Sequence, residues 1–271
     1  MIVDGRQIAE EVLAKVRGDV EALGRVPSFV AFAVAPSAAT LSYLKVKERQ
    51  AQAAGIEMVV RSLPETSTTE AIIDEIQAAA EDAVIVQLPL PPHVDLMRVL
   101  EAIPEDKDAD VLSPQVRASG PIMHPIAASI KDILARSIVS VYGARAVVVG
   151  QGWLVGQPVT AWLREAGAQV ETVTRESGDL MSLAPQADIL VSGTGSPGLI
   201  TTQLVKRGAT VIDVGTSELG GSIAGDVAPE VATVAGVFTP VPGGVGPVAV
   251  AYLMKNVAEL ARLRNANIGV H

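Results

Sequence analysis

The alternation of short apolar runs with amphipathic helical segments is the feature of this 271-residue sequence that most restricts its fold. Apolar runs over 29–34, 83–88, 144–150 and 210–214 each end at a turn rich in glycine, proline or small residues. Strands that alternate with helices form mainly parallel sheets, because each crossover helix returns the chain to the same end of the sheet. The sequence therefore predicts an α/β fold.

Composition supports parallel sheets and limits the classes of function. Hydrophobic residues make up 49% of the chain and aromatic residues 3%, so the core must be built from small and branched aliphatic side chains. The net charge of −9 argues against a nucleic-acid-binding surface. The absence of cysteine excludes disulfides, thiolate metal sites and a cysteine nucleophile. With no signal peptide and no membrane-length apolar stretch, we expect a cytoplasmic protein without a membrane partner.

Two α/β domains are expected, over residues 1–118 and 119–271. The helix over about 248–271 is expected to pack back near the first domain. In the second domain, glycines recur at the ends of predicted strands, as in a doubly wound nucleotide-binding sheet. Asp213, beside an apolar strand of this domain, is expected to cap a turn.

Several element boundaries follow from local signals. Small residues over 36–40 predict a loop before a helix over 41–54, and Gly55 stands where a C-cap glycine belongs. Ser67 and Glu70 have the spacing of a capping box at the start of the next helix. A further helix is expected over 125–140.

The pattern Gly150-x-Gly152-x-x-x-Gly156 follows a predicted strand and precedes a predicted helix, which is the context of a dinucleotide pyrophosphate turn. A close-packed strand–helix turn without a ligand is the alternative. Further on, Arg175 could pair with the ribose 2′-phosphate of NADP, whereas Glu176 could reject that phosphate. The sequence favours NADP as cofactor, with NAD possible.

Residues 238–248 contain three prolines and three glycines and lead directly into an apolar helix. The prolines stiffen the segment, and the glycines allow tight turns and a close approach of backbone N–H groups to a ligand. Such a loop before a helix N-terminus is suited to a cofactor or a polar substrate. The alternative is a tight connection that binds nothing.

Tyr43 and Lys47 are four residues apart and share one helix face, where such a pair can position and move protons. The lysine can act as a base only if its pKa falls. Gln87, at a strand end, could hydrogen-bond the amine, and Asp110 could accept two N–H donors from a heteroaromatic ring. The alternatives are a solvated lysine, a strand-end amide cap and a solvated acidic turn. The aspartates of 104–110 lack the glycine and distal glutamate of a calcium loop, so no metal site is expected.

Five motifs, taken in order, resemble the methylenetetrahydrofolate dehydrogenase/cyclohydrolase family of one-carbon metabolism. They are Tyr43-x-x-x-Lys47, Val86-Gln-Leu-Pro-Leu-Pro91, Lys107-Asp-Ala-Asp110, Gly150…Val155-Gly156-x-Pro158 and Thr239-Pro-Val-Pro-Gly-Gly-Val-Gly-Pro247. The resemblance covers nearly the whole chain. It implies an N-terminal folate-binding catalytic domain, a C-terminal Rossmann-type NAD(P)-binding domain with a cleft between the two, and a homodimer.

The resemblance implies two reactions. The first oxidises 5,10-methylenetetrahydrofolate to 5,10-methenyltetrahydrofolate with NADP, and the second hydrolyses that product to 10-formyltetrahydrofolate. Lys47 matches the catalytic lysine of the family and Gln87 the residue that tunes it. Tyr43 matches the tyrosine that stacks on the folate, and Asp110 matches the aspartate that binds the pterin edge.

The resemblance also implies two sets of binding residues. The substrate-binding set is Tyr43, Gln87, Leu88, Asp110, Pro242, Gly243 and Gly244. The cofactor-binding set is Gly150, Gln151, Gly152, Val155, Gly156, Thr174, Arg175, Gly193, Thr194, Gly215, Thr239 and Gly246. Two departures stand out: Gln151-Gly152 replaces the usual Arg-Ser pair after the first glycine, and Val111 replaces the glycine that usually follows the aspartate.

Two other functions stay open from the sequence alone. One is an NADP-dependent dehydrogenase of the same two-domain architecture that acts on another small acid and lacks cyclohydrolase activity. The other is a non-catalytic protein that binds a nucleotide or a folate.

Overall fold

The computed structural model describes residues 1–219 and 222–268. The chain divides into two compact units: a five-stranded unit of Met1–Ala9 with Ile126–Ala249, and a three-stranded unit of Glu10–Pro125 with Val250–His271. Neither unit is one continuous segment, because the chain passes from one to the other at residues 9–10, 125–126 and 249–250. In the described ranges, no helix is long and apolar enough to span a membrane.

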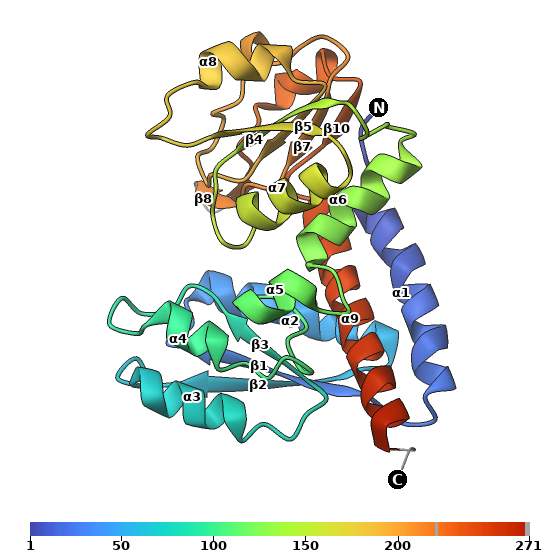
Figure 1. The fold of residues 1–271 in the computed structure, drawn as a ribbon, viewed down its shortest axis with the longest axis vertical. Helices are drawn as coiled ribbons and strands as arrows, with labels where there is room; N and C mark the ends of the chain where they lie inside the picture. Colours follow the sequence, from blue (N-terminus) through green and yellow to red (C-terminus); the bar gives the residue numbers. More distant parts are fainter. Residues whose placement is uncertain (220–221, 269–271) are drawn as a thin grey trace. The chain divides into compact units, whose positions relative to one another are not determined.

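The three-stranded unit is built on a parallel sheet with the order β2-β1-β3 (Figure 1). The strands are β1 (Ser28–Val34), β2 (Glu57–Leu63) and β3 (Ala83–Gln87). The central strand β1 is buried along almost its whole length, and Phe29 and Phe32 lie fully inside. Its continuous apolar sequence is what a strand covered on both faces requires.

Helices surround this sheet. The helix α2 packs against β2, and α3 packs against α4. The bounds in this unit are α2 (Ala38–Ala54), α3 (Thr69–Gln77), α4 (Leu96–Glu101) and α5 (Pro114–Ser119). Two longer helices, α1 (Gly5–Ala22) and α9 (Val245–Ile268), each contribute residues to both units.

Capping side chains determine where two of these helices begin, and both predicted starts were wrong. The helix α2 begins at Ala38, inside the predicted loop, because the side chain of Ser37 accepts a hydrogen bond from the Thr40 N–H (3.1 Å). The cap of α3 is Thr68, which accepts from the Ala71 N–H (3.2 Å), so the predicted capping box at Ser67 is one residue too early. Gly55 has φ 75° at the end of α2, as its predicted C-cap role requires.

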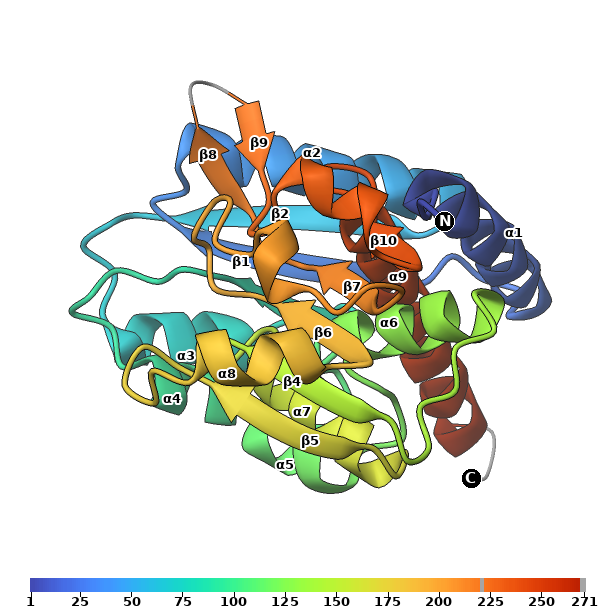
Figure 2. The ribbon, with the colours of Figure 1, turned by 90° about the horizontal axis from the view of Figure 1, so that it is seen from above.

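The five-stranded unit contains a parallel sheet with the order β10-β7-β6-β4-β5 (Figure 2). The chain runs from β4 outward to β5 and then returns to place β6 on the other side of β4, so the strand order reverses between β4 and β6. In open α/β sheets, ligands bind at such a reversal, beyond the carboxyl ends of the strands. The strands are β4 (Arg145–Val149), β5 (Gln169–Val173), β6 (Ile189–Ser192), β7 (Thr210–Asp213) and β10 (Val237–Thr239).

The remaining elements of this unit are short. The helix α6 ends at Arg136, four residues before the predicted end, and α7 begins directly after the glycine-rich turn. An antiparallel pair, β8 and β9, was not predicted. The bounds are α6 (Pro125–Arg136), α7 (Gly156–Glu165), α8 (Leu180–Leu183), β8 (Ser217–Leu219), β9 (Ser222–Ala224) and short 3-10 helices over Ala184–Gln186, Thr202–Leu204 and Pro229–Thr233.

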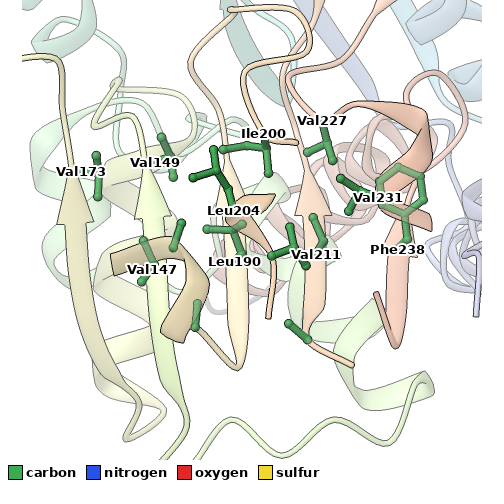
Figure 3. Close-up of a cluster of buried hydrophobic side chains, with 14 residues drawn as sticks. Val147, Val149, Val173, Leu190, Ile200, Leu204, Val211, Val227, Val231 and Phe238 are labelled. Atoms are coloured by element: carbon green, nitrogen blue, oxygen red, sulfur yellow. The ribbon is translucent and has the colours of Figure 1, made fainter. Parts of the chain in front are cut away.

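A cluster of buried branched side chains forms one core of the five-stranded unit (Figure 3). Val147, Leu190 and Val211 come from three adjacent strands and pack with Ile200 and Leu204 from the segment after β6. The aliphatic character of this cluster agrees with the composition. The prediction of an α/β fold with mainly parallel strands is confirmed.

Candidate active site

Lys47 lies at the centre of the candidate site in the three-stranded unit. Its side chain is almost completely buried, and Nζ donates a hydrogen bond to Gln87 Oε1 (3.1 Å). Nζ also lies 3.8 Å from Asp110 Oδ2 and 5.2 Å from the centroid of the Tyr43 ring. The structure therefore brings together the four residues that the sequence predicted to be catalytic.

The helix α2 presents Lys47 and Tyr43 differently. Lys47 belongs to the buried face of the helix, together with Leu44 and Ala51. Tyr43 is 42% exposed, so its ring has accessible surface on which a planar ligand could stack. The helical period thus delivers an amine to the interior and an aromatic ring beside it.

Gln87 stands at the carboxyl end of β3, where the buried strand meets the Pro-rich turn. Its Nε2 donates to the Leu88 carbonyl (2.9 Å), which directs the amide oxygen toward Lys47. Because an amide has one acceptor end and one donor end, the bond to Leu88 sets which end the lysine meets. Leu88, a predicted substrate-binding residue, is half-buried next to this contact.

The backbone before Asp110 is held by contacts from two distant segments. Asp108 pairs with Val84 of β3, three residues before Gln87 in the same strand, and its carboxylate accepts hydrogen bonds from the Leu112 and Ser113 N–H groups. From α9, the Asn256 amide donates to the Ala109 carbonyl (2.8 Å). These bonds immobilise the loop on which Asp110 faces Lys47.

Val111 follows Asp110 in an unfavourable backbone conformation, with φ 55°. A β-branched residue rarely adopts the left-handed region, because its side chain crowds the neighbouring peptide. The Arg117 Nε donates to the Val111 carbonyl (3.0 Å) and so helps to hold this conformation. Val111, which stands where the resemblance implies a glycine, therefore keeps a backbone shape that a glycine adopts without strain.

Burial and charge act in opposite directions on the Lys47 amine. Burial lowers the pKa of Lys47, since the charged form loses hydration, and the nearby Asp110 carboxylate raises that pKa by a smaller amount. An amine with a lowered pKa, oriented by an amide, can accept and return a proton. The arrangement thus has the components of general acid–base chemistry.

The predicted cofactor residues of the five-stranded unit gather at the carboxyl edge of its sheet. The register pairs Val149 with Val173 on one side and with Ser192 on the other, so the strands end together. Gly150 N–H donates to the Val173 carbonyl (2.8 Å), and Gly193 N–H donates to the Val149 carbonyl (2.9 Å). Gly150, Thr174 and Gly193 are consequently neighbours at the reversal of strand order.

Glycines make this edge compact. Gly150 has φ 90°, and a Cβ there would lie 2.7 Å from the Gly193 carbonyl oxygen. A Cβ on Gly156 would collide with the Gly150 carbonyl, and one on Gly193 would collide with Val155. Gly152 faces open space instead.

The residues present fit a dinucleotide. The helix α7 begins at Gly156, and Val155 before it provides no side-chain cap for the first-turn N–H groups. A helix N-terminus without a side-chain cap, next to a glycine turn at a strand reversal, is suited to a pyrophosphate. A close-packed strand–helix turn without a ligand would explain why Gly150 and Gly156 are glycines. It would not explain the open space beside Gly152.

Two side chains that bear on the choice of cofactor are oriented differently. Gln151 is folded onto its own turn, because its Nε2 donates to the Gly150 carbonyl (3.0 Å) and to Thr160 Oγ1 (3.1 Å). Arg175 is exposed in the turn that follows β5. That turn begins at Thr174, whose N–H donates to Ser177 Oγ (3.0 Å).

The predicted Pro/Gly loop begins with a strand, β10, that sequence analysis did not identify. Thr239 is fully buried there, and its hydroxyl accepts from the Asp213 N–H (2.8 Å), so its side chain joins β10 to β7. Gly243 has φ 104°, and its carbonyl accepts from the Gly5 N–H (2.9 Å). The loop is therefore tied to the first turn of α1.

The other predicted residues of this region differ in exposure. Pro242 and Gly246 are exposed, Gly244 and Gly215 are buried, and Thr194 is half-buried. Asn256 also holds the site, although no sequence motif predicted it. The available signal was one neutral polar residue within the apolar run 250–257.

Two family models match this chain, one over its N-terminal part and one over its C-terminal part. Residues 3–110 match the catalytic domain of tetrahydrofolate dehydrogenase/cyclohydrolase, and residues 125–265 match the NAD(P)-binding domain. The chain belongs to the tetrahydrofolate dehydrogenase/cyclohydrolase family. The prediction of this family from the five motifs is confirmed.

Curated relatives that match this chain over nearly their full length are named bifunctional protein FolD. The bifunctional protein FolD of Methanospirillum hungatei is 40% identical over 274 residues, which cover 97% of this chain and 98% of the relative. The bifunctional protein FolD of Thermus thermophilus is 36% identical, with coverage of 97% and 96%.

Solved structures agree. The bifunctional FolD enzyme of Campylobacter jejuni superimposes with a TM-score of 0.92 at 28% identity, covering 97% of this chain and 99% of that one. The Trypanosoma brucei enzyme, complexed with NADP cofactor and inhibitor, has a TM-score of 0.90 at 33% identity and 98% coverage of both chains. Shikimate 5-dehydrogenase of Thermus thermophilus, at 16% identity and a TM-score of 0.53, shares the fold alone. The chain is thus a bifunctional dehydrogenase/cyclohydrolase of tetrahydrofolate metabolism with an NAD(P)-binding domain.

Proposed function

We propose that Lys47, Gln87, Tyr43 and Asp110 carry the folate chemistry of this enzyme. The reactions are the oxidation of 5,10-methylenetetrahydrofolate to 5,10-methenyltetrahydrofolate and the hydrolysis of that cation to 10-formyltetrahydrofolate. The observation that carries the proposal is the buried Lys47 amine, 3.1 Å from Gln87 Oε1 and 3.8 Å from Asp110 Oδ2. No other function is needed to explain this grouping.

Lys47 is the proton carrier of the hydrolytic step. Water adds to the methenyl carbon and loses one proton, which gives a neutral hydroxyl adduct. The bond from that carbon to N5 then breaks as N5 gains a proton, and the hydroxyl group releases its own proton to solvent as it becomes the formyl C=O, so that one proton is released overall. A neutral amine can take the first proton, and the resulting ammonium can supply the second. The lowered pKa of Lys47 supports this role, because burial increases the neutral fraction of the amine at a given pH.

The other three residues orient the amine and the folate. The Gln87 amide, fixed by the Leu88 carbonyl, directs the amine. Asp110 accepts N–H donors of the pterin, and the exposed ring of Tyr43 stacks on the folate. Leu88, Pro242, Gly243 and Gly244 complete the proposed substrate-binding set.

The carboxyl edge of the five-stranded sheet is the proposed NADP site. When bound, NADP supplies an acceptor for the hydride that leaves the methylene carbon. Gly150, Gly152 and Gly156 with the α7 N-terminus would hold the pyrophosphate, and Arg175 would select the 2′-phosphate. The remaining proposed contacts are Gln151, Val155, Thr174, Gly193, Thr194, Gly215, Thr239 and Gly246; for Thr239, whose hydroxyl is used by β7, the contact would be through the backbone.

We also propose a folate-binding catalytic domain over residues 1–118 and a Rossmann-type NAD(P)-binding domain over 119–271, as sequence ranges from which the compact units differ at residues 1–9, 119–125 and 250–268. A homodimer and a location in the cytoplasm are proposed as well. The family supports these proposals, and each has its own measurement. Sedimentation of the purified protein would test the dimer, and fractionation of the source cells would test the location.

Replacement of Lys47 by methionine tests the catalytic assignment. Lys47→Met keeps the length of the side chain and removes the proton carrier, so we expect hydrolysis of 5,10-methenyltetrahydrofolate to fall by about 100-fold or more. Folate binding, measured by calorimetry, should largely remain. The loss of methenyl absorbance without NADP gives the hydrolytic rate directly.

The matched control is Lys45→Met, which changes an exposed lysine of the same helix. It should hydrolyse the substrate at the wild-type rate. Normal hydrolysis by Lys47→Met would refute the role of Lys47.

A further inference from the structure

Asp226 is a buried carboxylate outside the predicted site, two residues after the end of β9, and it is 1% exposed. Its Oδ2 accepts hydrogen bonds from Ser192 Oγ (2.8 Å), Thr194 N (2.6 Å) and Thr194 Oγ1 (3.0 Å). Its Oδ1 accepts from Ser196 N (2.8 Å). One carboxylate therefore organises the whole segment 192–196, which leaves β6 at the carboxyl edge of the sheet.

A second buried carboxylate fixes Asp226 itself. Asp213, at the end of β7, accepts from the backbone N–H groups of Asp226 (3.1 Å) and Val227 (2.9 Å). Asp213 also caps the turn at Gly215 (2.9 Å), as the sequence predicted, and burial raises its pKa to about 6. The two carboxylates act in series: Asp213 holds the backbone of Asp226, and the Asp226 side chain holds the segment after β6.

The surrounding sequence is shaped around these carboxylates. A Cβ on Gly215 would overlap the Asp226 carboxylate, and a Cβ on Gly225 would overlap the Asp213 carboxylate. Glycine at 215 is thus required by the packing of Asp226, whether or not a cofactor approaches it. Asp213 and Asp226 therefore help to hold the carboxyl edge of the five-stranded sheet in its folded conformation.

The segment that Asp226 holds includes two proposed cofactor contacts. Gly193 and Thr194 lie beside the proposed pyrophosphate turn, because Gly193 N–H donates to the Val149 carbonyl and the Gly193 carbonyl limits Gly150 to glycine. A displacement of this segment would therefore change the surface offered to the dinucleotide.

We propose that Asp226 is a positioning residue for the nicotinamide cofactor and acts through the Ser192–Ser196 segment. The inference rests on the proposed NADP site at this edge. A carboxylate is required because both of its oxygens face donors, and two of those donors are backbone N–H groups that cannot turn away. An asparagine in either orientation would set its NH2 group against one of them.

The test uses Asp226→Asn in the full-length enzyme. We expect the NADP dissociation constant, measured by calorimetry, and the KM for NADP to rise by about tenfold or more. We expect kcat at saturating NADP to stay within about threefold of wild type, because Asp226 does not touch the reacting atoms. Hydrolysis of 5,10-methenyltetrahydrofolate in the absence of NADP should be unchanged, because the hydrogen bonds that the Asp226 carboxylate accepts come from none of the proposed substrate-binding residues.

Asp188→Asn is the matched control. Asp188 precedes the same strand β6 at its opposite end, where it accepts from Arg145 N and Lys206 Nζ. The same chemical change there should leave NADP affinity at the wild-type value. Ser192→Ala removes one hydroxyl donor from Asp226 without creating a buried donor clash, and it should raise the dissociation constant by a few-fold. This second variant tests the inference even where Asp226→Asn does not fold.

The outcomes separate the inference from the proposed function. Unchanged NADP affinity in both Asp226→Asn and Ser192→Ala would overturn the inference. So would a parallel loss of NADP binding and NADP-free hydrolysis, since that pattern indicates general destabilisation. A wild-type enzyme that does not oxidise 5,10-methylenetetrahydrofolate with NADP would instead refute the proposed function.

Discussion

Lys47 illustrates how one residue can be set between two opposing effects. Burial lowers the pKa of its amine, and the negative charge of Asp110 partly offsets that decrease. The balance between the two determines the pH above which a neutral amine is present. Activity that requires this amine as a base should therefore rise with pH through the pKa of Lys47.

Removal of the Asp110 charge should move that pH dependence in a known direction. In Asp110→Asn the charge that raises the pKa of Lys47 is gone, so the pKa falls further and the rising limb of kcat for methenyl hydrolysis shifts toward lower pH. The measurement is kcat against pH at saturating folate, since the variant should also bind folate more weakly. Asp106→Asn, in the exposed part of the same loop, should leave the limb in place. A shift toward higher pH in Asp110→Asn would contradict this account.

Arg175 bears on cofactor choice through a single charge. Its side chain is exposed beside the carboxyl edge of the sheet, where a 2′-phosphate would find a guanidinium partner. Arg175→Ala should raise the KM for NADP by about tenfold and leave the KM for NAD nearly unchanged, so the preference of the enzyme for NADP over NAD becomes smaller. Arg207→Ala, an exposed arginine of the same unit, serves as control. A wild-type enzyme that is faster with NAD than with NADP, together with an unchanged KM for NADP in Arg175→Ala, would exclude Arg175 as the partner of the 2′-phosphate.

At the scale of elements, the end of α6 has a recognisable geometry with an unusual residue. Val139 N–H donates to the Leu134 carbonyl and Ile138 N–H donates to the Ala135 carbonyl, which is the Schellman pattern. Ile138 occupies the left-handed position with φ 57° and is 94% exposed. Glycine normally occupies that position, so the isoleucine adds strain without gaining burial.

Ile138→Gly should therefore stabilise the protein. Relief of the left-handed strain exceeds the extra chain entropy of glycine, and we expect a gain of about 0.5–1 kcal/mol in the free energy of unfolding. A rise of roughly 2 °C in melting temperature would report it. Ile138→Ala keeps the Cβ and should change little. Equal melting temperatures for the glycine and alanine variants would show that the strain is absent.

Some helices and strands could be predicted from the sequence and others could not. The apolar run at 29–34 and the helical spacing of Tyr43 and Lys47 specify elements through their periods, and both were found in place. The start of α2 depends on which of several hydroxyl residues caps it, and that choice requires the folded backbone. The short strand β10 is defined by its pairing with β7 and not by its own pattern.

At the scale of the whole molecule, α9 connects regions that are far apart in sequence. It begins in the five-stranded unit, and Asn256 within it donates to the carbonyls of Ala109 (2.8 Å) and Met123 (2.9 Å) in the three-stranded unit. Asp110 could be predicted from its motif, but the residue that holds its loop could not, since Asn256 lies more than a hundred residues away in sequence. Asp226 was missed for the same reason: the donors to its carboxylate lie 30 residues or more before it.

Asn256→Ala should weaken both the fold and the site. The buried Ala109 carbonyl and the half-buried Met123 carbonyl lose their donor, and we expect a loss of about 1–3 kcal/mol in the free energy of unfolding and a higher KM for folate. Chemical denaturation and steady-state assays measure these effects. Asn265→Ala, which removes an exposed contact of the same helix with Arg25, should cost under about 1 kcal/mol and leave the KM for folate unchanged. Equal stability of the two variants would argue against a role for Asn256 in holding the loop.

The interleaving of the two units has a consequence for how the chain is made. The ribosome completes residues 10–125 well before residues 250–268, and those late residues belong to the same unit. Residues 10–125 must therefore remain without this helical segment while residues 126–249, which form most of the five-stranded unit, are synthesised. We expect this interval of synthesis to be the stage at which chaperones and proteases have most access to the polypeptide.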